Sequence, residues 1–349
     1  MTTRNLKLAF DIGGSSLRII DEEKYITKFP SQYIEMDKKE YIVDKTKDDD
    51  LIDLRMRLSD GTVIRKRIIV DKSMMQYAKS KVELLNNKPK TKSEELFVLL
   101  AVSMHAYLKE NCSNVTNIIL NKAVVLLPPS EAYSEALQEF KRKFADAEIE
   151  LKYPKKESGK KITIEVKEIV VVPEGITAMW AMDDKSLEEI GPRYSLLVDT
   201  GKRSTDMALV VDGDLYNGAT STYDIAGLTL EALIGLEFSR KGKDLSTVDI
   251  IEIITTGKYH KDTDVTDILN KCKENFMKML HDRMSQLCNA AAGSTKIIDN
   301  IVLFGRVFND APGSKKMSKI LQELMPDVKI FSQDDGLMNI RGAGSLLDE

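Results

Sequence analysis

The sequence predicts an α/β fold built from two lobes of similar construction. Apolar strand segments alternate with amphipathic helical segments along the whole chain, an order typical of layered α/β domains. A strand that ends in an aspartate and a glycine turn occurs twice, once near the N-terminus and once past the middle. The length of 349 residues also exceeds what one simple core usually takes and fits two lobes.

Residues 1–190 are expected to form the first lobe, with residues 31–90 as a small inserted subdomain. A strand over 7–11 breaks at a glycine pair and returns as a strand over 16–20. In the charge-rich insert, apolar and charged residues alternate over 52–58, which indicates a half-buried strand. A turn then leads into a second strand.

The rest of this lobe begins with a helix. Thr91 or Ser93 can cap it, and apolar residues recur on one face of the segment that follows. The further elements expected are strands over 123–127, 162–166 and 169–172, a helix after Ser130, and a short helix over about 174–182.

Residues 191–335 are expected to form the second lobe, with an insert at about 225–292. The junction between the lobes is placed in the polar stretch 183–193, which contains Gly191 and Pro192. The elements expected beyond it are strands over 194–199 and 301–304, a long helix over 265–288, and a C-terminal helix in 336–349 that returns to the first lobe.

Composition excludes several classes of protein. There are 51 Lys and Arg against 55 Asp and Glu, which argues against a chain-wide basic surface for nucleic acid. Three cysteines make neither a disulfide framework nor a zinc pattern, and three histidines make a His-rich metal centre unexpected. Neither a membrane-spanning run nor a signal peptide is found, so we expect a cytoplasmic protein without direct membrane binding.

The two strand–turn segments resemble each other in detail. Residues 8–18 and 196–206 both run from an apolar strand through Asp, one residue and Gly into a short turn and a second strand. Asp11 and Asp199 lie too far apart for a solenoid repeat, which favours a duplicated lobe. The alternative is an ordinary pair of hairpins in which Asp and Gly serve only the turns.

Such a pair of turns suits polyphosphate chemistry. A glycine turn can place backbone N–H groups against phosphate oxygens, because no side chain blocks the approach. A strand-end aspartate cannot contact phosphate favourably by itself, but it can hold Mg²⁺ or its waters, and the metal then bridges to the phosphates. Two turns from two lobes could therefore grip one polyphosphate from both sides.

The chain resembles the superfamily of actin, heat-shock chaperones and sugar kinases. Residues 11–18 resemble its first phosphate motif and residues 199–206 its second. Residues 171–178 resemble the first connecting segment, 301–306 the adenosine motif, and 339–347 the second connecting helix. The five motifs come in family order. The resemblance therefore implies an actin-like ATPase fold, with two duplicated lobes around a nucleotide cleft and a small inserted subdomain in each.

Within that superfamily, the chain looks most similar to the plasmid-segregating actins of the ParM type. Three segments carry this likeness: Phe29 to Ser31, Val124 to Pro128 followed by Tyr133, and Asp224 to Gly227. The resemblance implies an ATPase that polymerises into a polar filament. It also implies a DNA-binding adaptor protein that links the filament to a plasmid centromere.

The resemblance also assigns roles to particular residues. Asp11 and Asp199 would organise Mg²⁺, through water, and the attacking water. Glu174 would orient or deprotonate that water, although a carboxylate at a helix N-terminus is also favourable without catalysis. The residues expected to bind the nucleotide are Gly13, Gly14, Ser15, Ser16, Arg18, Gly201, Lys202, Gly305 and Arg306.

Two departures from the family pattern affect these assignments. Lys202 and Arg203 stand where the family usually keeps glycines in the second phosphate turn, so either the backbone approaches the phosphates less closely or Lys202 adds its own charge to them. Phe304, Gly305 and Arg306 replace a glycine pair in the adenosine motif. The resemblance implies ATP as the nucleotide, and this departure leaves GTP open.

Other functions on the same fold are alternatives. A sugar- or acetate-kinase-type phosphotransferase would also use the motif at residues 11–18, but 31–180 show no sugar-binding signature. A chaperone-type ATPase would need a separate peptide-binding domain. A membrane-tethered actin often carries an amphipathic segment, which is not evident here.

Overall fold

The computed structural model describes residues 2–14, 16–36, 50–70, 81–83, 89–112, 114–154, 160–260, 263–333 and 336–348. The chain forms two compact units. The first comprises Met1–Pro173 together with Asn339–Glu349, and the second comprises Glu174–Met338. No helix within the described ranges is both long and apolar enough to cross a membrane.

The first unit is built on one large sheet. Its described strands follow the order β3-β2-β1-β8-β10-β9-β5-β6-β4-β7, and β11 also pairs with β8. Strands β1, β10 and β11 run parallel to β8, whereas the other pairs are antiparallel. The strands are β1 (Thr3–Ile12), β2 (Ser16–Asp21), β3 (Ile26–Pro30), β4 (Gln32–Glu35), β5 (Leu51–Arg57), β6 (Val63–Ile69), β7 (Lys81–Glu83), β8 (Asn117–Leu127), β9 (Glu148–Lys152), β10 (Lys161–Val166) and β11 (Ile169–Pro173).

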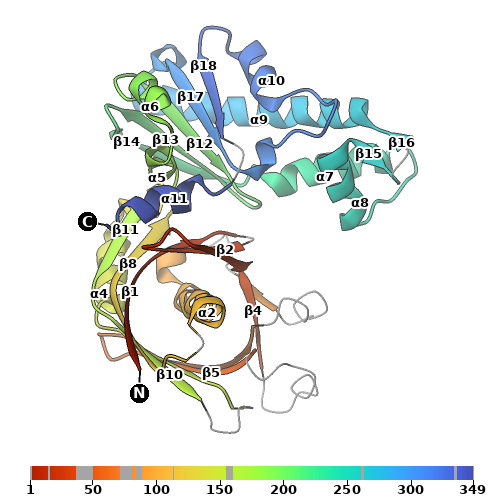
Figure 1. Ribbon diagram of the computed structural model, residues 1–349. Helices are drawn as coiled ribbons and strands as arrows, with labels where there is room; N and C mark the ends of the chain where they lie inside the picture. The colour runs from red at the N-terminus through yellow and green to blue at the C-terminus, as the bar shows by residue number, and fades with distance from the viewer. Residues whose placement is uncertain are drawn as a thin grey trace. The chain divides into compact units, whose positions relative to one another are not determined.

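This sheet curls around helix α2 (Glu94–Asn111), as Figure 1 shows. Every residue of α2 from Leu96 to Leu108 is buried. The single apolar face expected from the sequence is therefore too narrow, because a helix enclosed by a sheet needs apolar contacts on all sides. Strands β5 and β6 of the expected insert belong to this same sheet and contribute to the core around α2.

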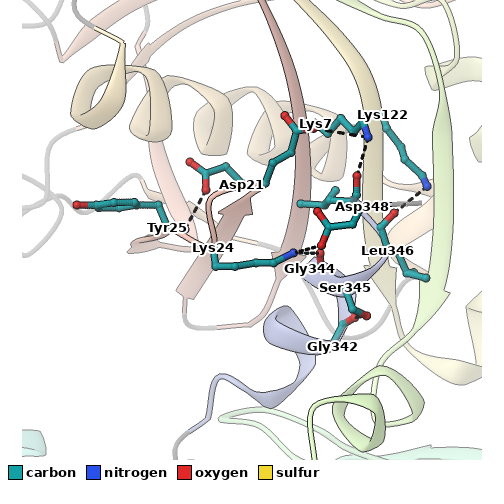
Figure 2. Close-up of polar contacts among 12 residues, drawn as sticks. Lys7, Asp21, Lys24, Tyr25, Lys122, Gly342, Gly344, Ser345, Leu346 and Asp348 are labelled. Carbon is teal, nitrogen blue, oxygen red and sulfur yellow. Dashed lines mark hydrogen bonds and ion pairs between the residues drawn. The ribbon is translucent and has the colours of Figure 1, made fainter.

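The C-terminal helix α11 (Met338–Ser345) and the residues after it are fastened to the first unit by three lysines, shown in Figure 2. Lys7 Nζ donates to the Leu347 carbonyl (2.8 Å), Lys24 Nζ to that of Gly344 (2.9 Å), and Lys122 Nζ to that of Leu346 (2.8 Å). The last carbonyls of a helix lack donors within the helix, and cations are favourable there. The lysines thus donate to one carbonyl in the last turn of α11 and to two carbonyls just beyond the helix.

The second unit has a sheet covered by helices on both faces. Its described strands follow the order β14-β13-β12-β17-β18, with β12, β17 and β18 parallel. Leu196 and Val198 pack with α7 (Gly227–Ser239), α9 (Thr266–Ala292) and α10 (Met317–Leu324), while Leu197 packs with α5 (Ile176–Trp180) and α6 (Asp184–Ile190), because alternate residues of a strand point to opposite faces. The strands are β12 (Ser195–Thr200), β13 (Thr205–Val211), β14 (Asp214–Tyr223), β17 (Asn300–Phe304) and β18 (Lys329–Gln333).

The helices of the second unit include several that the sequence pattern did not reveal. The polar stretch expected as a lobe junction contains α6, whose N-cap Asp183 accepts a hydrogen bond from the Ser186 N–H (3.0 Å). The long helix expected over 265–288 is α9 and ends at Gly293. The helices are α5 (Ile176–Trp180), α6 (Asp184–Ile190), α7 (Gly227–Ser239), α8 (Thr247–Thr256), α9 (Thr266–Ala292) and α10 (Met317–Leu324), and a small hairpin, β15 (Lys258–Tyr259) and β16 (Thr263–Asp264), precedes α9.

Candidate functional site

The two similar sequence segments form hairpins of the same register. Strands β1 and β2 pair Asp11 with Arg18, and β12 and β13 pair Asp199 with Asp206. Each turn is closed by the N–H of its first glycine, which donates to the carbonyl of the residue three positions later. These bonds measure 3.2 Å for Gly13 and 2.9 Å for Gly201. The repeat in the sequence is thus also a repeat in backbone geometry.

In the first hairpin, the aspartate is held by an arginine. Asp11 is 3% exposed, and its Oδ2 accepts a hydrogen bond from Arg18 Nη1 across the two strands. A Cβ on Gly13 would lie 3.0 Å from the Ser16 carbonyl oxygen, so a side chain there would crowd the turn. Gly14 is half-buried and Ser16 is buried, while Ser15 lies outside the described residues.

The parallel strands around this hairpin end together. Asp11 of β1 is in register with Leu126 of β8, and Pro173 of β11 with Leu127. Ligands of open α/β sheets bind at the carboxyl ends of the strands, which is the edge where this hairpin lies. Glu174 follows Pro173 directly and is 8% exposed.

Two further polar residues at this edge were missed by the sequence analysis. Lys90, in the 3₁₀ turn η2 (Lys90–Lys92), donates from Nζ to the carbonyl of Ile12 (3.2 Å). Glu131, in the short helix α3 (Pro129–Ala132), accepts from the N–H groups of Lys90 (2.9 Å) and Thr91 (2.8 Å) and from the Thr91 hydroxyl (2.9 Å). No pattern in the sequence connects either residue to the first turn.

The second hairpin is held by the start of α7. The Gly227 N–H donates to the Gly201 carbonyl (3.1 Å), and the Leu228 N–H donates to that of Lys202 (2.8 Å). In a trans peptide, the carbonyl and the next N–H point in opposite directions. The N–H groups of Lys202 and Arg203 therefore point away from α7.

Gly305 is required by a backbone contact. It has a φ of +113°, and a Cβ there would lie 2.2 Å from the Thr200 carbonyl oxygen. Because β17 is parallel to β12, with Asp199 beside Phe304, this close approach brings the end of β17 against the second hairpin. Arg306 begins the 3₁₀ turn η4 (Arg306–Phe308) and packs against Gly336. Asp199, Gly201, Gly305 and Arg306 thus share one edge of the sheet.

The donor set of the second hairpin is consistent with a hard divalent cation. Asp199 and Asp206 lie directly opposite each other, and like charges in that relation destabilise a strand pair. The part of the chain that the structure describes has no cluster of three or more His, Cys, Asp and Glu side chains able to hold a metal. Mg²⁺ needs only one or two carboxylates, with water and phosphate completing its shell. Asp199 therefore fits a site in which Mg²⁺ would be held largely through water.

Comparison with known proteins defines the fold. No family model and no curated protein sequence matches this chain. The solved structure of the actin-like protein Alp7A matches with a TM-score of 0.75 at 16% identity, over 99% of this chain and 96% of that one. Ta0583, an archaeal actin homologue in complex with ADP, matches with 0.66 at 14% identity, over 100% and 99%.

A ParM filament subunit is similar in the same way. The structure of a 15-stranded ParM filament from Clostridium botulinum matches with a TM-score of 0.59 at 17% identity, over 100% of this chain and 99% of that one. Likeness at such low identity establishes the fold. With its two β-sheet units matched along nearly the whole chain, the protein has the mixed α/β actin-like fold that the sequence predicts.

Proposed function

We propose that this protein binds ATP with Mg²⁺, hydrolyses it, and polymerises into polar filaments that segregate plasmid DNA through an adaptor protein. The observation that carries the proposal is the repeated hairpin, which has the same register and the same glycine closure in both units of an actin-like fold. Two similar neighbours support it, because one was solved with ADP and another as a filament.

The phosphates are bound by the turns. In the second hairpin, the outward N–H groups of Lys202 and Arg203 donate to phosphate oxygens, and the Lys202 ammonium adds a charge that a glycine would not supply. In the first hairpin, Gly13, Gly14, Ser15 and Ser16 also bind phosphate. Gly305 and Arg306 lie beside the second hairpin and contact the nucleoside.

Asp11, Asp199 and Glu174 have different roles in the proposed reaction. Asp11 and Asp199 would hold a bound Mg²⁺, which would supply positive charge that offsets the charge of the phosphates. Both carboxylates would act through the waters of the metal, and the bond from Arg18 fixes the orientation of the Asp11 carboxylate. Glu174 accepts a hydrogen bond from the attacking water and takes up its proton as the bond to the γ-phosphorus forms, while the bond from that phosphorus to the β–γ bridging oxygen breaks and ADP leaves with its electron pair. Its burial limits the orientations the carboxylate can adopt.

A polar filament forms when each subunit contacts the next through two different surfaces. A contact between two different surfaces of the same chain does not close, so it generates an open, polar helix. If the polymer favours the state with bound triphosphate, hydrolysis weakens the contact by the difference in affinity between the two states. The adaptor and the plasmid centromere are proposed on the resemblance to the ParM type.

The test uses the full purified chain with Mg²⁺ and ATP. We expect the protein to pellet on centrifugation, to form filaments by electron microscopy, and to return to the supernatant as phosphate is released. GTP in place of ATP tests nucleotide preference. Failure to bind either nucleotide would overturn the proposal. Phosphate transfer to a sugar or to acetate without pelleting would favour a kinase.

A further inference from the structure

We infer that Lys90 is a phosphate-binding residue that also positions the first hairpin. Its ammonium holds the carbonyl of Ile12 and places a positive charge beside the turn at Gly13. The inference rests on the proposed function, because it takes the bound ligand to be a nucleoside polyphosphate. It adds a cation that the family resemblance did not assign.

Strand β8 does not supply a donor for this carbonyl. Asp11 pairs with Leu126, so the parallel register carries Ile12 to the end of β8. Beyond Leu127 the chain continues into Pro128 and Pro129, which have no N–H to continue the ladder. A buried carbonyl without a partner is costly, and the Lys90 ammonium meets this need.

The position of Lys90 is fixed by the same segment that ends the ladder. Glu131 follows the two prolines and uses both carboxylate oxygens on three donors of the η2 turn. Lys90 is half-buried, whereas Lys92 in the same turn is exposed. The backbone of Lys90 is thus anchored, and its side chain is directed to the hairpin.

A positive charge at this point affects phosphate binding differently from a neutral hydrogen-bond donor. Arg18 is bonded to Asp11, so those two charges compensate each other. The Lys90 ammonium lies no more than roughly 5.5 Å from the Gly13 nitrogen, since it is 3.2 Å from the Ile12 oxygen, which is about 2.3 Å from that nitrogen. A cation this close to a phosphate-binding turn strengthens binding more as the ligand carries more negative charge.

The first experiment compares nucleotide affinities of Lys90→Gln, Lys90→Arg and the matched control Lys92→Gln. ATP, ADP and adenosine each displace a fluorescent ATP analogue at low and high salt. For Lys90→Gln we expect about 10-fold weaker ATP binding, a smaller loss for ADP, none for adenosine, and a shallower salt dependence. Lys90→Arg should restore most of the affinity, and Lys92→Gln should match the wild type.

The outcomes separate the inference from the proposed function. If the wild type binds nucleotide and Lys90→Gln binds it equally well, the role of Lys90 is wrong and the proposed function stands. An equal loss for ATP and adenosine would leave Lys90 only a structural donor and would also overturn the inference. A wild-type chain that binds no nucleotide overturns both.

A second experiment does not depend on the folding of a variant. The wild-type chain is treated briefly with an amine-reactive reagent, with and without saturating ATP, and the modified lysines are identified by mass spectrometry. We expect ATP to slow modification of Lys90 several-fold and to leave Lys92 unchanged. Equal modification of Lys90 in both samples would contradict a contact with phosphate.

Discussion

Asp199 lies directly opposite Asp206 across the second hairpin, at the register position where the first hairpin pairs an aspartate with an arginine. The two hairpins therefore have the same backbone register but differ in the charges of the paired side chains. The first carries a compensated pair. The second carries two carboxylates, of which Asp206 accepts a hydrogen bond from the Thr222 hydroxyl (2.5 Å).

Asp206→Asn should stabilise the metal-free protein by about 0.2–1 kcal/mol, because it removes a like-charge pair and keeps an acceptor for Thr222. In the presence of Mg²⁺ and ATP, the gain should shrink or reverse, since a cation already compensates the carboxylates of the wild type. Urea unfolding with and without Mg²⁺ and ATP measures the change in the free energy of unfolding in each condition. A stability gain of the same size in the two conditions would argue against a metal at this hairpin.

Gly305→Ala should cost several kcal/mol of stability. The new Cβ would lie 2.2 Å from the Thr200 carbonyl oxygen, so the backbone of β17 or β12 must shift. Gly313→Ala is the matched control. It also has a positive φ, of +78°, but a Cβ there meets nothing within 4 Å, and it should cost about 1 kcal/mol. Equal losses in urea unfolding would show that backbone strain alone, and not the contact with Thr200, requires Gly305.

Glu174→Ala should leave ATP binding nearly unchanged and slow hydrolysis by about 10²-fold or more, the effect expected when a water-orienting carboxylate is lost. Single-turnover phosphate release measures the rate of hydrolysis, and nucleotide titration measures the affinity for ATP. Asp184→Ala, at the exposed start of α6, is a control for a carboxylate that only favours a helix N-terminus. Wild-type turnover in Glu174→Ala would remove Glu174 from the mechanism.

Lys122→Met should loosen the C-terminal segment. The variant keeps the apolar stem but removes the donor to the Leu346 carbonyl, a partly buried bond from a charged group worth about 1.5–3 kcal/mol. Hydrogen exchange of the amides after Gly342 should then become faster, while exchange in α9 stays unchanged. Lys141→Met, in α4 (Glu135–Phe144), is the control. Unaltered exchange would mean that packing against Ile20, and not the lysine, holds this segment.

The two cysteines of α9 should be unreactive in the native protein. Burial raises the pKa of Cys272 and of Cys288 from 9.0 to about 11, so thiolate is scarce at pH 8. Because the folded pKa exceeds the unfolded one, the stability contributed is complete below pH 9.0 and is lost as pH rises toward about 11. Iodoacetamide labelling at pH 8 and urea unfolding from pH 8 to 11 check both. Rapid labelling of the folded chain would contradict this.

The local elements were largely predictable from the sequence. Turns and strand ends are set by short-range chemistry, so the glycine turns, the β5–β6 hairpin and the extent of α9 follow from residue order. The second turn is a more instructive case. Its lysine and arginine leave looser phosphate contact open as an alternative, and only the structure shows that the bonds from Gly227 and Leu228 direct the backbone N–H groups of this turn away from α7.

By itself, the sequence determined the α/β class, the duplicated hairpins and the resemblance that predicts the actin-like fold, because these depend on order along the chain. Only the tertiary structure decided that α2 is buried on every side, that Arg18 is bonded to Asp11, and that Lys90 reaches the carbonyl of Ile12. Each of these depends on how a sheet curves and where its ladder ends. Such contacts join residues far apart in sequence or across a turn, and no periodicity in the chain records them.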